Sequence, residues 1–123
     1  MKKLKYEDIR KKYIRFFKQN NHKEIPSAPL VPEDDPSVLF VNAGMFPLVP
    51  FLKGVKHPDG NRLVNSQRCI RTNDIDLVGD PYHLTAFEML GNWSLNDYFK
   101  KGAIELTIQF FVEELGLDID KIY

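Results

Sequence analysis

The sequence predicts an α+β fold in which an antiparallel sheet is flanked by helices. Three observations predict it: an aromatic stripe with helical spacing near the start, two extended segments joined by a polar loop, and a second helical pattern after Ser94. The chain has 123 residues, 43% of them hydrophobic and 28% charged, which is enough for one core. We therefore expect residues 1–123 to form a single domain.

The first element is a helix that packs through an aromatic face. Its apolar side chains recur at helical spacings along one stripe: Tyr6, Ile9, Tyr13, Phe16 and Phe17. The pattern predicts a helix that runs to about Asn20.

A proline-rich connection follows this helix. Prolines fix the backbone and remove a donor, so they favour a rigid, irregular course: Pro26, Pro29, Pro32 and Pro36. Residues 37–42 (SVLFVN) are rich in strand formers, and they predict a strand that turns at Gly44.

The next segment is short and broken by turns. Two more prolines limit residues 46–52 to a brief helical turn, and residues 57–60 (HPDG) carry a clear turn signal. Residues 62–71 and 84–93 then predict two strands of a long hairpin, joined by the polar loop 72–82.

The sequence predicts a second helix after the hairpin. Ser94, followed three residues later by Asp97, predicts a helix start with an acidic first turn, and Gly116 predicts its end. Residues 117–123 alternate as a strand would and then stop. An unfinished strand suggests that the chain is part of a larger fold.

The charge and cysteine content set limits on partners. The formal net charge is zero, so any contact with RNA must be local. The most basic stretch, from Lys2 and Lys3 to Lys18, predicts either a solvated helix face or an RNA or partner contact. The single cysteine, Cys69, predicts a reducing, cytoplasmic setting, and its spacing from the histidines predicts no metal site. No run of apolar residues in the sequence is long enough to predict a membrane span.

Several rare strings occur in an order that resembles one family. They are LVP (30–32), DPSVLFVNAGM (35–45), SQRCIR (66–71), NDIDLVG (73–79), HLTAFEMLGNWS (83–94) and DYFK (97–100). Together they resemble the alanyl-tRNA synthetases, which are class II aminoacyl-tRNA synthetases. The resemblance covers residues 6–123.

The resemblance implies the N-terminal portion of a class II catalytic domain. Motif 1 of the class would lie at about residues 6–44 and motif 2 at about residues 62–94. The implied reaction is ATP-dependent activation of alanine to alanyl-adenylate, followed by transfer to tRNA(Ala). The implied partners are ATP with Mg²⁺, alanine, and tRNA(Ala) through the full-length enzyme, and zinc is not expected in this segment.

Arg71 is the catalytic residue that the resemblance implies. Its forked guanidinium suits a reaction that brings a phosphate and a carboxylate together, because the charge is never lost. Arg68, three residues earlier, is expected on the opposite side of the pleat, where a structural and a functional role are equally open. Cys69 between them is expected to be a small packed side chain.

Five further residues are candidates for binding ATP or the adenylate. The resemblance aligns Phe87 with the aromatic ring that stacks on adenine, although a packed core phenylalanine fits the same pattern. Glu88 would face the other side, either in a buried pair or on a ligand. The loop residues Asn73 and Asp74 could reach phosphate or ribose or simply form a turn. Met45 and His83 remain open between ligand contact and packing or structure.

Nothing in the sequence resembles motif 3, which completes the ATP site of class II synthetases. Three hypotheses therefore stay open. The chain is part of a synthetase, a free-standing nucleotide-binding or regulatory module, or a structural partner whose unfinished sheet pairs with another chain or with the missing remainder of the catalytic domain.

Overall fold

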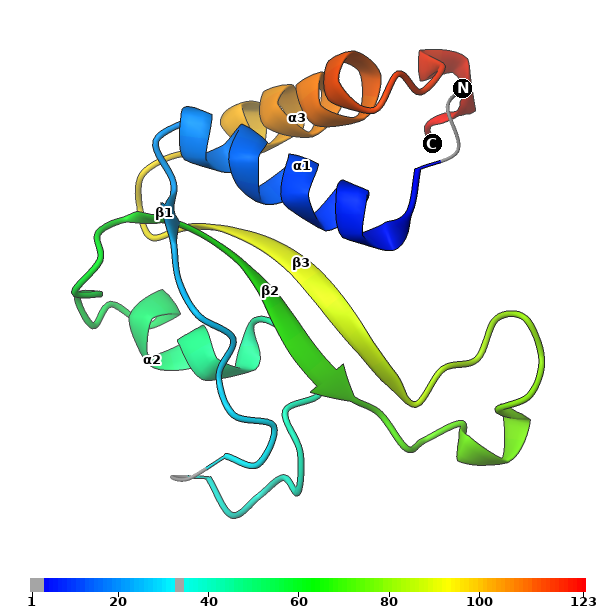
Figure 1. The fold of residues 1–123 in the computed structure, drawn as a ribbon. Coiled ribbons are helices and arrows are strands. Elements are labelled where there is room, and N and C mark those ends of the chain that lie inside the picture. Colours follow the sequence, from blue (N-terminus) through cyan, green and yellow to red (C-terminus); the bar gives the residue numbers. More distant parts are fainter. Residues whose placement is uncertain (1–3, 33–34) are drawn as a thin grey trace.

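The computed structural model describes residues 4–32 and 35–123. Residues 1–3, which include Lys2 and Lys3 of the basic stretch, and residues 33–34 lie outside it. The elements, in chain order, are α1 (Tyr6–Gln19), β1 (Lys23–Glu24), α2 (Val49–Leu52), β2 (Arg62–Ile70), β3 (Ala86–Ser94) and α3 (Lys100–Ile108). Figure 1 shows the long β2–β3 hairpin with α1 and α3 on one side and α2 on the other.

The hairpin is the centre of the fold, and its prediction is confirmed. The two strands are antiparallel, with Arg62 opposite Ser94 at one end and Ile70 opposite Ala86 at the other. On the outer side of β2, the two residues of β1 add a short parallel pairing. The α+β class is therefore correct, whereas the three-stranded sheet is mixed rather than strictly antiparallel.

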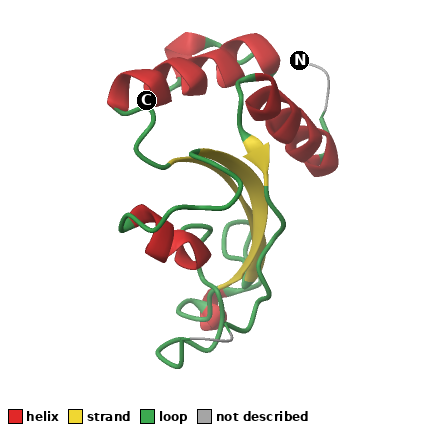
Figure 2. Cartoon of the chain, turned by 90° about the vertical axis from the view of Figure 1, so that its left-hand side faces the viewer, coloured by secondary structure: helices red, strands yellow, loops and turns green. Residues whose placement is uncertain are grey.

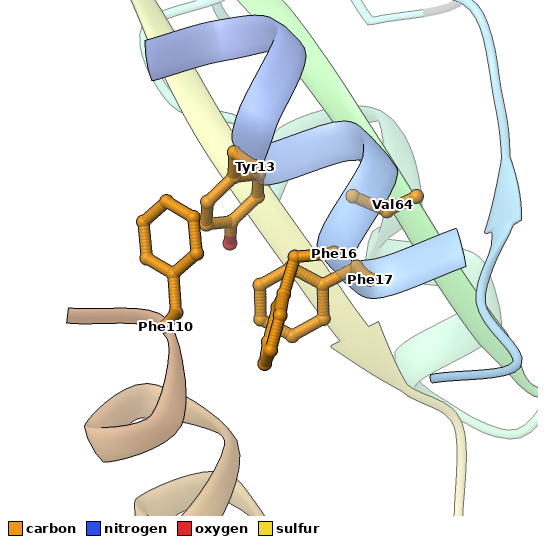
Figure 3. Close-up of a cluster of buried hydrophobic side chains, with 5 residues drawn as sticks. All are labelled: Tyr13, Phe16, Phe17, Val64 and Phe110. Carbon is orange, nitrogen blue, oxygen red and sulfur yellow. The ribbon is translucent and has the colours of Figure 1, made fainter. Parts of the chain in front are cut away.

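One face of the hairpin packs against α1. Five buried side chains form this core, and Figure 3 shows them together: Tyr13, Phe16, Phe17, Val64 and Phe110. Tyr13 and Phe110 meet edge to face with their ring centroids 5.1 Å apart, a favourable aromatic geometry. The predicted stripe holds except at its start, because Tyr6 lies in the first turn of α1 and is 70% exposed.

The opposite face packs against α2 and the connection before it. Its core consists of Ile25, Leu48, Leu63 and Leu95, with Phe51 and Trp93 at the margin. Figure 2 shows α2 beside the curved sheet, away from the two long helices. The predicted short helical turn at residues 46–52 is confirmed, since a 3₁₀ turn at Phe46–Leu48 leads directly into α2.

The strand predicted for residues 37–42 is wrong. The segment bends at Leu39 and Phe40 and touches the sheet at one residue only. The Val41 N–H donates to the Leu30 carbonyl (2.7 Å), and the Val41 carbonyl accepts from the Ile70 N–H (2.9 Å). A longer ladder cannot form because an earlier part of the chain already lies along the same edge of β2.

Gln67 holds that earlier part in place. Its side chain is fully buried and pairs with Ala28 as a peptide group would: Oε1 accepts from the Ala28 N–H (2.8 Å), and Nε2 donates to the Ala28 carbonyl (3.1 Å). The Arg68 N–H donates to Ser27 Oγ (3.1 Å) next to it. The edge of β2 is thus covered by side-chain and isolated backbone bonds, which satisfy its buried polar groups.

The start predicted for the second helix is also wrong. α3 begins at Lys100, six positions after the expected Ser94. Ser94 instead ends β3, where its Oγ accepts from the N–H groups of Asp97 (3.3 Å) and Tyr98 (2.7 Å) in a tight turn. This local bonding is the alternative that serine offers to helix capping.

The end of the helical segment agrees with the sequence. A π-helical stretch, Gln109–Glu114, continues α3, and Gly116 follows with φ of +68°, a backbone conformation that glycine adopts without strain. The strand predicted for residues 117–123 is wrong, since Ile119–Lys121 forms a 3₁₀ turn. Asp118 caps this turn by accepting from the Asp120 N–H (3.2 Å).

A buried polar network ties α1 to the end of β3. His22 is 4% exposed, and its Nδ1 faces the carbonyl oxygens of Phe17 (3.1 Å) and Asn20 (2.9 Å). Carbonyl oxygens only accept, so Nδ1 carries the proton and the neutral ring presents Nε2 as an acceptor. The Tyr98 hydroxyl, 2.8 Å from Nε2, then donates to it.

Two further hydrogen bonds connect the Tyr98 hydroxyl to α1. Asn92 Nδ2 donates to the Tyr98 hydroxyl (3.0 Å), and the Tyr13 hydroxyl donates to Asn92 Oδ1 (2.8 Å). Burial raises the pKa of both tyrosines, which keeps their hydroxyl protons in place. Burial also lowers the pKa of His22, although the bonds to the carbonyls of Asn20 and Phe17 partly offset this effect. The lowered pKa of His22 favours the neutral histidine in this network.

The stability of the chain is expected to fall in mildly acidic solution because of His22. Its folded-state pKa is lowered, so its contribution is complete above the unfolded pKa of about 6.5 and is lost as pH falls below it. Urea unfolding at several pH values between about 5 and 8 tests this. The His22→Gln variant, which cannot titrate, should show a shallower loss. Equal pH dependence of the two proteins would contradict the assignment.

Candidate functional site

The candidate site lies on the α2 side of the hairpin, toward the loop. Successive residues of a strand point to opposite faces, so Leu63, which packs near α2, shares its face with Arg71. On β3 the same argument groups Trp93 with Phe87. The structure therefore brings two of the predicted site residues, Arg71 and Phe87, to one face.

Arg71 follows β2 directly and extends its pairing by one residue. Its N–H donates to the Thr85 carbonyl (2.9 Å), and its side-chain Nε donates to the Asn42 carbonyl (2.9 Å). The centre of the guanidinium lies over the Phe87 ring, 5.2 Å from the ring centroid. Among the described residues, the two terminal amino groups have no hydrogen-bond partner, so they remain available for an oxyanion.

Asn42 is a site residue that sequence reasoning missed. Its carbonyl is positioned by the neighbouring Val41, which is 2% exposed and is held from both sides by backbone bonds to Leu30 and Ile70. The string NAGM marked this region, but the contribution of a main-chain carbonyl has no side-chain signature. The tertiary course of the connection is what places it beside Arg71.

The turn at residues 43–45 forms one wall of the site. The Gly44 N–H points at Met89 Sδ (3.2 Å), and a Cβ at Gly44 would lie 3.2 Å from Trp93 Cζ2. Trp93 in turn donates from Nε1 to the buried Asn65 Oδ1 (3.0 Å). Met45, the predicted pocket residue, follows this turn and is 51% exposed.

A glycine on β3 makes room for that tryptophan. A Cβ at Gly91 would approach Trp93 Cζ2 to 2.5 Å, too close for any side chain there without moving the indole. Gly91 thus belongs to the packing of the wall rather than to a turn.

The remaining predicted site residues lie in the loop after Arg71. Asn73 and Asp74 are exposed at the start of a 3₁₀ turn, Ile75–Leu77. Within residues 4–32 and 35–123, neither hydrogen-bonds to Arg71. His83 pairs with Asp80 (2.6 Å), and the bonds from His83 lower the pKa of the Asp80 carboxyl. Among the described residues, none of these three is hydrogen-bonded to Arg71.

Comparison with known families decides which fold this hairpin belongs to. Residues 8–123 match the family of class II (A) tRNA synthetases. The chain belongs to that family. Its long antiparallel hairpin, with an arginine at the first strand end and an aromatic residue on the second strand, is therefore the hairpin of a class II synthetase chain.

Curated relatives with closely similar sequences carry one name. An alanine–tRNA ligase of Treponema denticola is 55% identical over 123 residues, which are 98% of this chain and 20% of the relative. The ligase of the same name from Borreliella burgdorferi is 56% identical over 92% of the chain and 19% of its own length. That of Staphylococcus aureus is 48% identical over the whole chain and 14% of its own length. The chain thus spans about a fifth or less of these relatives.

The other face of this class II synthetase hairpin carries a structural ion pair. Glu88 accepts from Arg10 of α1 (2.6 Å) and from Ser66 (3.1 Å), and both charged side chains are 34% exposed. The structural reading of Glu88 is therefore observed, in a half-exposed pair rather than a buried one. Arg68 lines a groove of about 580 Å³ on this α1 side, opposite Arg71 as predicted.

Cys69, between the two arginines, is a packed side chain. It is 1% exposed, and burial raises the pKa of its thiol. A buried thiol with a raised pKa is a poor nucleophile, which agrees with the packing role predicted for it.

The basic face of α1 is largely compensated within the chain. Lys18 pairs with Glu24 (2.8 Å) and Arg15 with Glu114 (3.5 Å), in addition to the pair between Arg10 and Glu88. These pairs suit a solvated face. Over the ranges 4–32 and 35–123, no helix is long and apolar enough to cross a membrane, and no three metal-ligating side chains lie together.

Proposed function

We propose that this chain forms the N-terminal, ATP-binding part of the catalytic domain of an alanine–tRNA ligase. The observation that carries the proposal is Arg71, whose guanidinium lies over the Phe87 ring and has, within the described part of the chain, two amino groups without a hydrogen-bond partner. The names of relatives about 55% identical to nearly the whole chain support alanine as the amino acid and tRNA(Ala) as the acceptor.

The proposed reaction begins with activation of alanine. A carboxylate oxygen of alanine forms a bond to the α-phosphorus of ATP, and the bond from that phosphorus to pyrophosphate breaks. Two anionic groups must approach, and negative charge builds on the α-phosphate oxygens. We propose that the two terminal amino groups of Arg71 bind one oxygen of the α-phosphate and one oxygen of the alanine carboxylate. A guanidinium suits this role because it is planar, forked and permanently charged. The alanyl group then passes to tRNA(Ala) in the complete enzyme.

Phe87 is proposed to stack on adenine. It lies in β3 opposite Cys69 of β2, so its backbone position is set by the hairpin rather than by the loop after Arg71. Met45 is proposed at the edge of the same pocket because its turn packs against Met89 and Trp93. Asn73, Asp74 and His83 are proposed to reach ATP only when the exposed loop moves toward the site.

Mg²⁺ is proposed to arrive bound to the phosphates of ATP. The described residues do not group three metal-ligating side chains, so they do not fit a protein cage for the ion. This suits magnesium, which is commonly held by substrate phosphates and one or two carboxylates. No chemical step of the present chain is assigned to it.

The unpaired edge of β3 is the proposed contact with the rest of the enzyme. In the part of the chain described here, β3 is the last strand of the sheet, with β2 on one side. An exposed strand edge is a ready template for another strand. We propose that a later segment of the catalytic domain pairs there, and that the complete enzyme acts in the cytoplasm.

The experiment is alanine-dependent exchange of pyrophosphate into ATP by the complete enzyme. Phe87→Leu should raise the KM for ATP about 5- to 150-fold, because base stacking on an aromatic ring contributes about 1–3 kcal/mol. Phe87→Tyr, which keeps the ring, should stay near wild type. Exchange supported by another amino acid but not by alanine would overturn the proposed substrate, and an unchanged KM in Phe87→Leu would overturn the proposed adenine contact.

A further inference from the structure

The guanidinium of Arg71 lies over the ring on which adenine is proposed to stack. Its centre lies 5.2 Å from the Phe87 ring centroid, within the range of a cation–π contact. Resting on the proposed ATP site, we infer that Arg71 screens Phe87 until a phosphate draws the guanidinium away. The site would thereby favour nucleotides over nucleosides carrying the same base.

Other residues lie around the Phe87 ring on the sides away from Arg71. On the same face of the pleat, Cys69 lies directly across from Phe87 and is 1% exposed. Met89, two residues along β3, contacts the Gly44 N–H through its sulfur, so the 43–45 turn fills that direction. A planar ligand that approaches Phe87 from the loop end of the hairpin therefore meets the guanidinium.

The guanidinium is held at the ring weakly enough to be moved. Within the described ranges, Arg71 pairs with no carboxylate, and its side chain bonds only to the Asn42 carbonyl. Hydrogen bonds from a guanidinium to phosphate are charge-assisted and roughly twice as strong as neutral ones, whereas a cation–π contact at an exposed site is weak. A phosphate within reach therefore outcompetes the ring, while an uncharged nucleoside offers no such attraction.

This arrangement predicts opposite effects of one substitution on two ligands. Arg71→Ala removes both the screen and the phosphate contact. Binding of adenosine should become about two- to fivefold tighter, the factor that corresponds to an exposed cation–π contact. Binding of ATP and of tripolyphosphate should become weaker. A purely attractive role of Arg71 would instead leave adenosine unchanged.

The test measures dissociation constants of the 123-residue chain for adenosine, ATP and tripolyphosphate by ligand-observed NMR. Arg68→Ala, which removes an arginine from the opposite face, is the matched control and should leave all three constants unchanged. Circular dichroism confirms that each variant is folded, and Arg71→Gln provides a second variant that keeps a long side chain without the charge.

The outcomes separate this inference from the proposed function. Weaker ATP binding with unchanged or weaker adenosine binding in both Arg71 variants overturns the screen and leaves the ATP site standing. A wild-type chain that binds none of the three ligands also overturns the screen, while pyrophosphate exchange by the complete enzyme independently decides the proposed function. Tighter adenosine binding in Arg68→Ala as well would show a nonspecific charge effect and overturn the inference.

Discussion

Replacing Arg71 with alanine is expected to slow the proposed adenylate formation by the complete enzyme roughly a hundredfold or more, the range found when one donor to a developing oxyanion is lost. The physical reason is that charge on the reacting phosphate is greatest in the transition state. A contact made there lowers kcat as well as kcat/KM. Removing the side chain should leave the fold intact, because Arg71 is exposed and its backbone bond to Thr85 remains.

Pyrophosphate exchange and thermal melting of the same preparations provide the measurement. Arg71→Lys should recover little of the rate, because an ammonium group cannot reproduce the fork or the Nε bond to the Asn42 carbonyl. A folded Arg71→Ala enzyme that exchanges at nearly the wild-type rate would show that Arg71 is not the central catalytic residue.

The largest stability effect is expected for Phe17→Ala. Phe17 is 2% exposed and packs against Tyr13, Phe16 and Phe110, with ring centroids 4.6, 5.1 and 6.4 Å away. Truncating a buried phenylalanine removes its transfer free energy and leaves a cavity, which together cost about 3–5 kcal/mol. That loss is a large part of the stability of a typical small domain, about 5–15 kcal/mol.

Urea unfolding compares this variant with Phe99→Ala. Phe99 is 70% exposed just before α3, so the same chemical change there should alter the free energy of unfolding by less than about 0.5 kcal/mol. Similar losses in the two variants would mean that the core shown in Figure 3 does not hold α1 to the sheet.

Regular elements with a strong local pattern were predictable from the residues. The helix at Tyr6–Gln19 and the two hairpin strands follow from apolar periodicity, and the φ of +68° at Gly116 follows from the rule for helix ends. The failures have separate causes. Residues 37–42 have strand-like composition, but earlier residues already bond to the edge of β2. In residues 117–123 Asp118 caps a 3₁₀ turn, and at the predicted start of the second helix Ser94 bonds in a tight turn.

The candidate site was likewise predictable from the sequence only in part. The family resemblance pointed to Arg71 and Phe87, and the observed register of β2 and β3 places the two on one face of the hairpin. The resemblance did not indicate the Asn42 carbonyl, because any residue supplies one. Nor did it indicate that His83 bonds to Asp80 within the loop.

The sequence by itself therefore determined the hairpin, its two faces and the family, because these depend on side-chain order along the chain. The tertiary structure decided which residues cover the edge of β2, which carbonyl binds the Arg71 side chain and which charged side chains form ion pairs. Gln67 illustrates the difference: its side-chain amide bonds to both backbone groups of Ala28, 39 positions away, which no local pattern indicates. Such pairing of hydrogen-bonding groups is settled only when distant segments meet, because every buried donor and acceptor must find a partner.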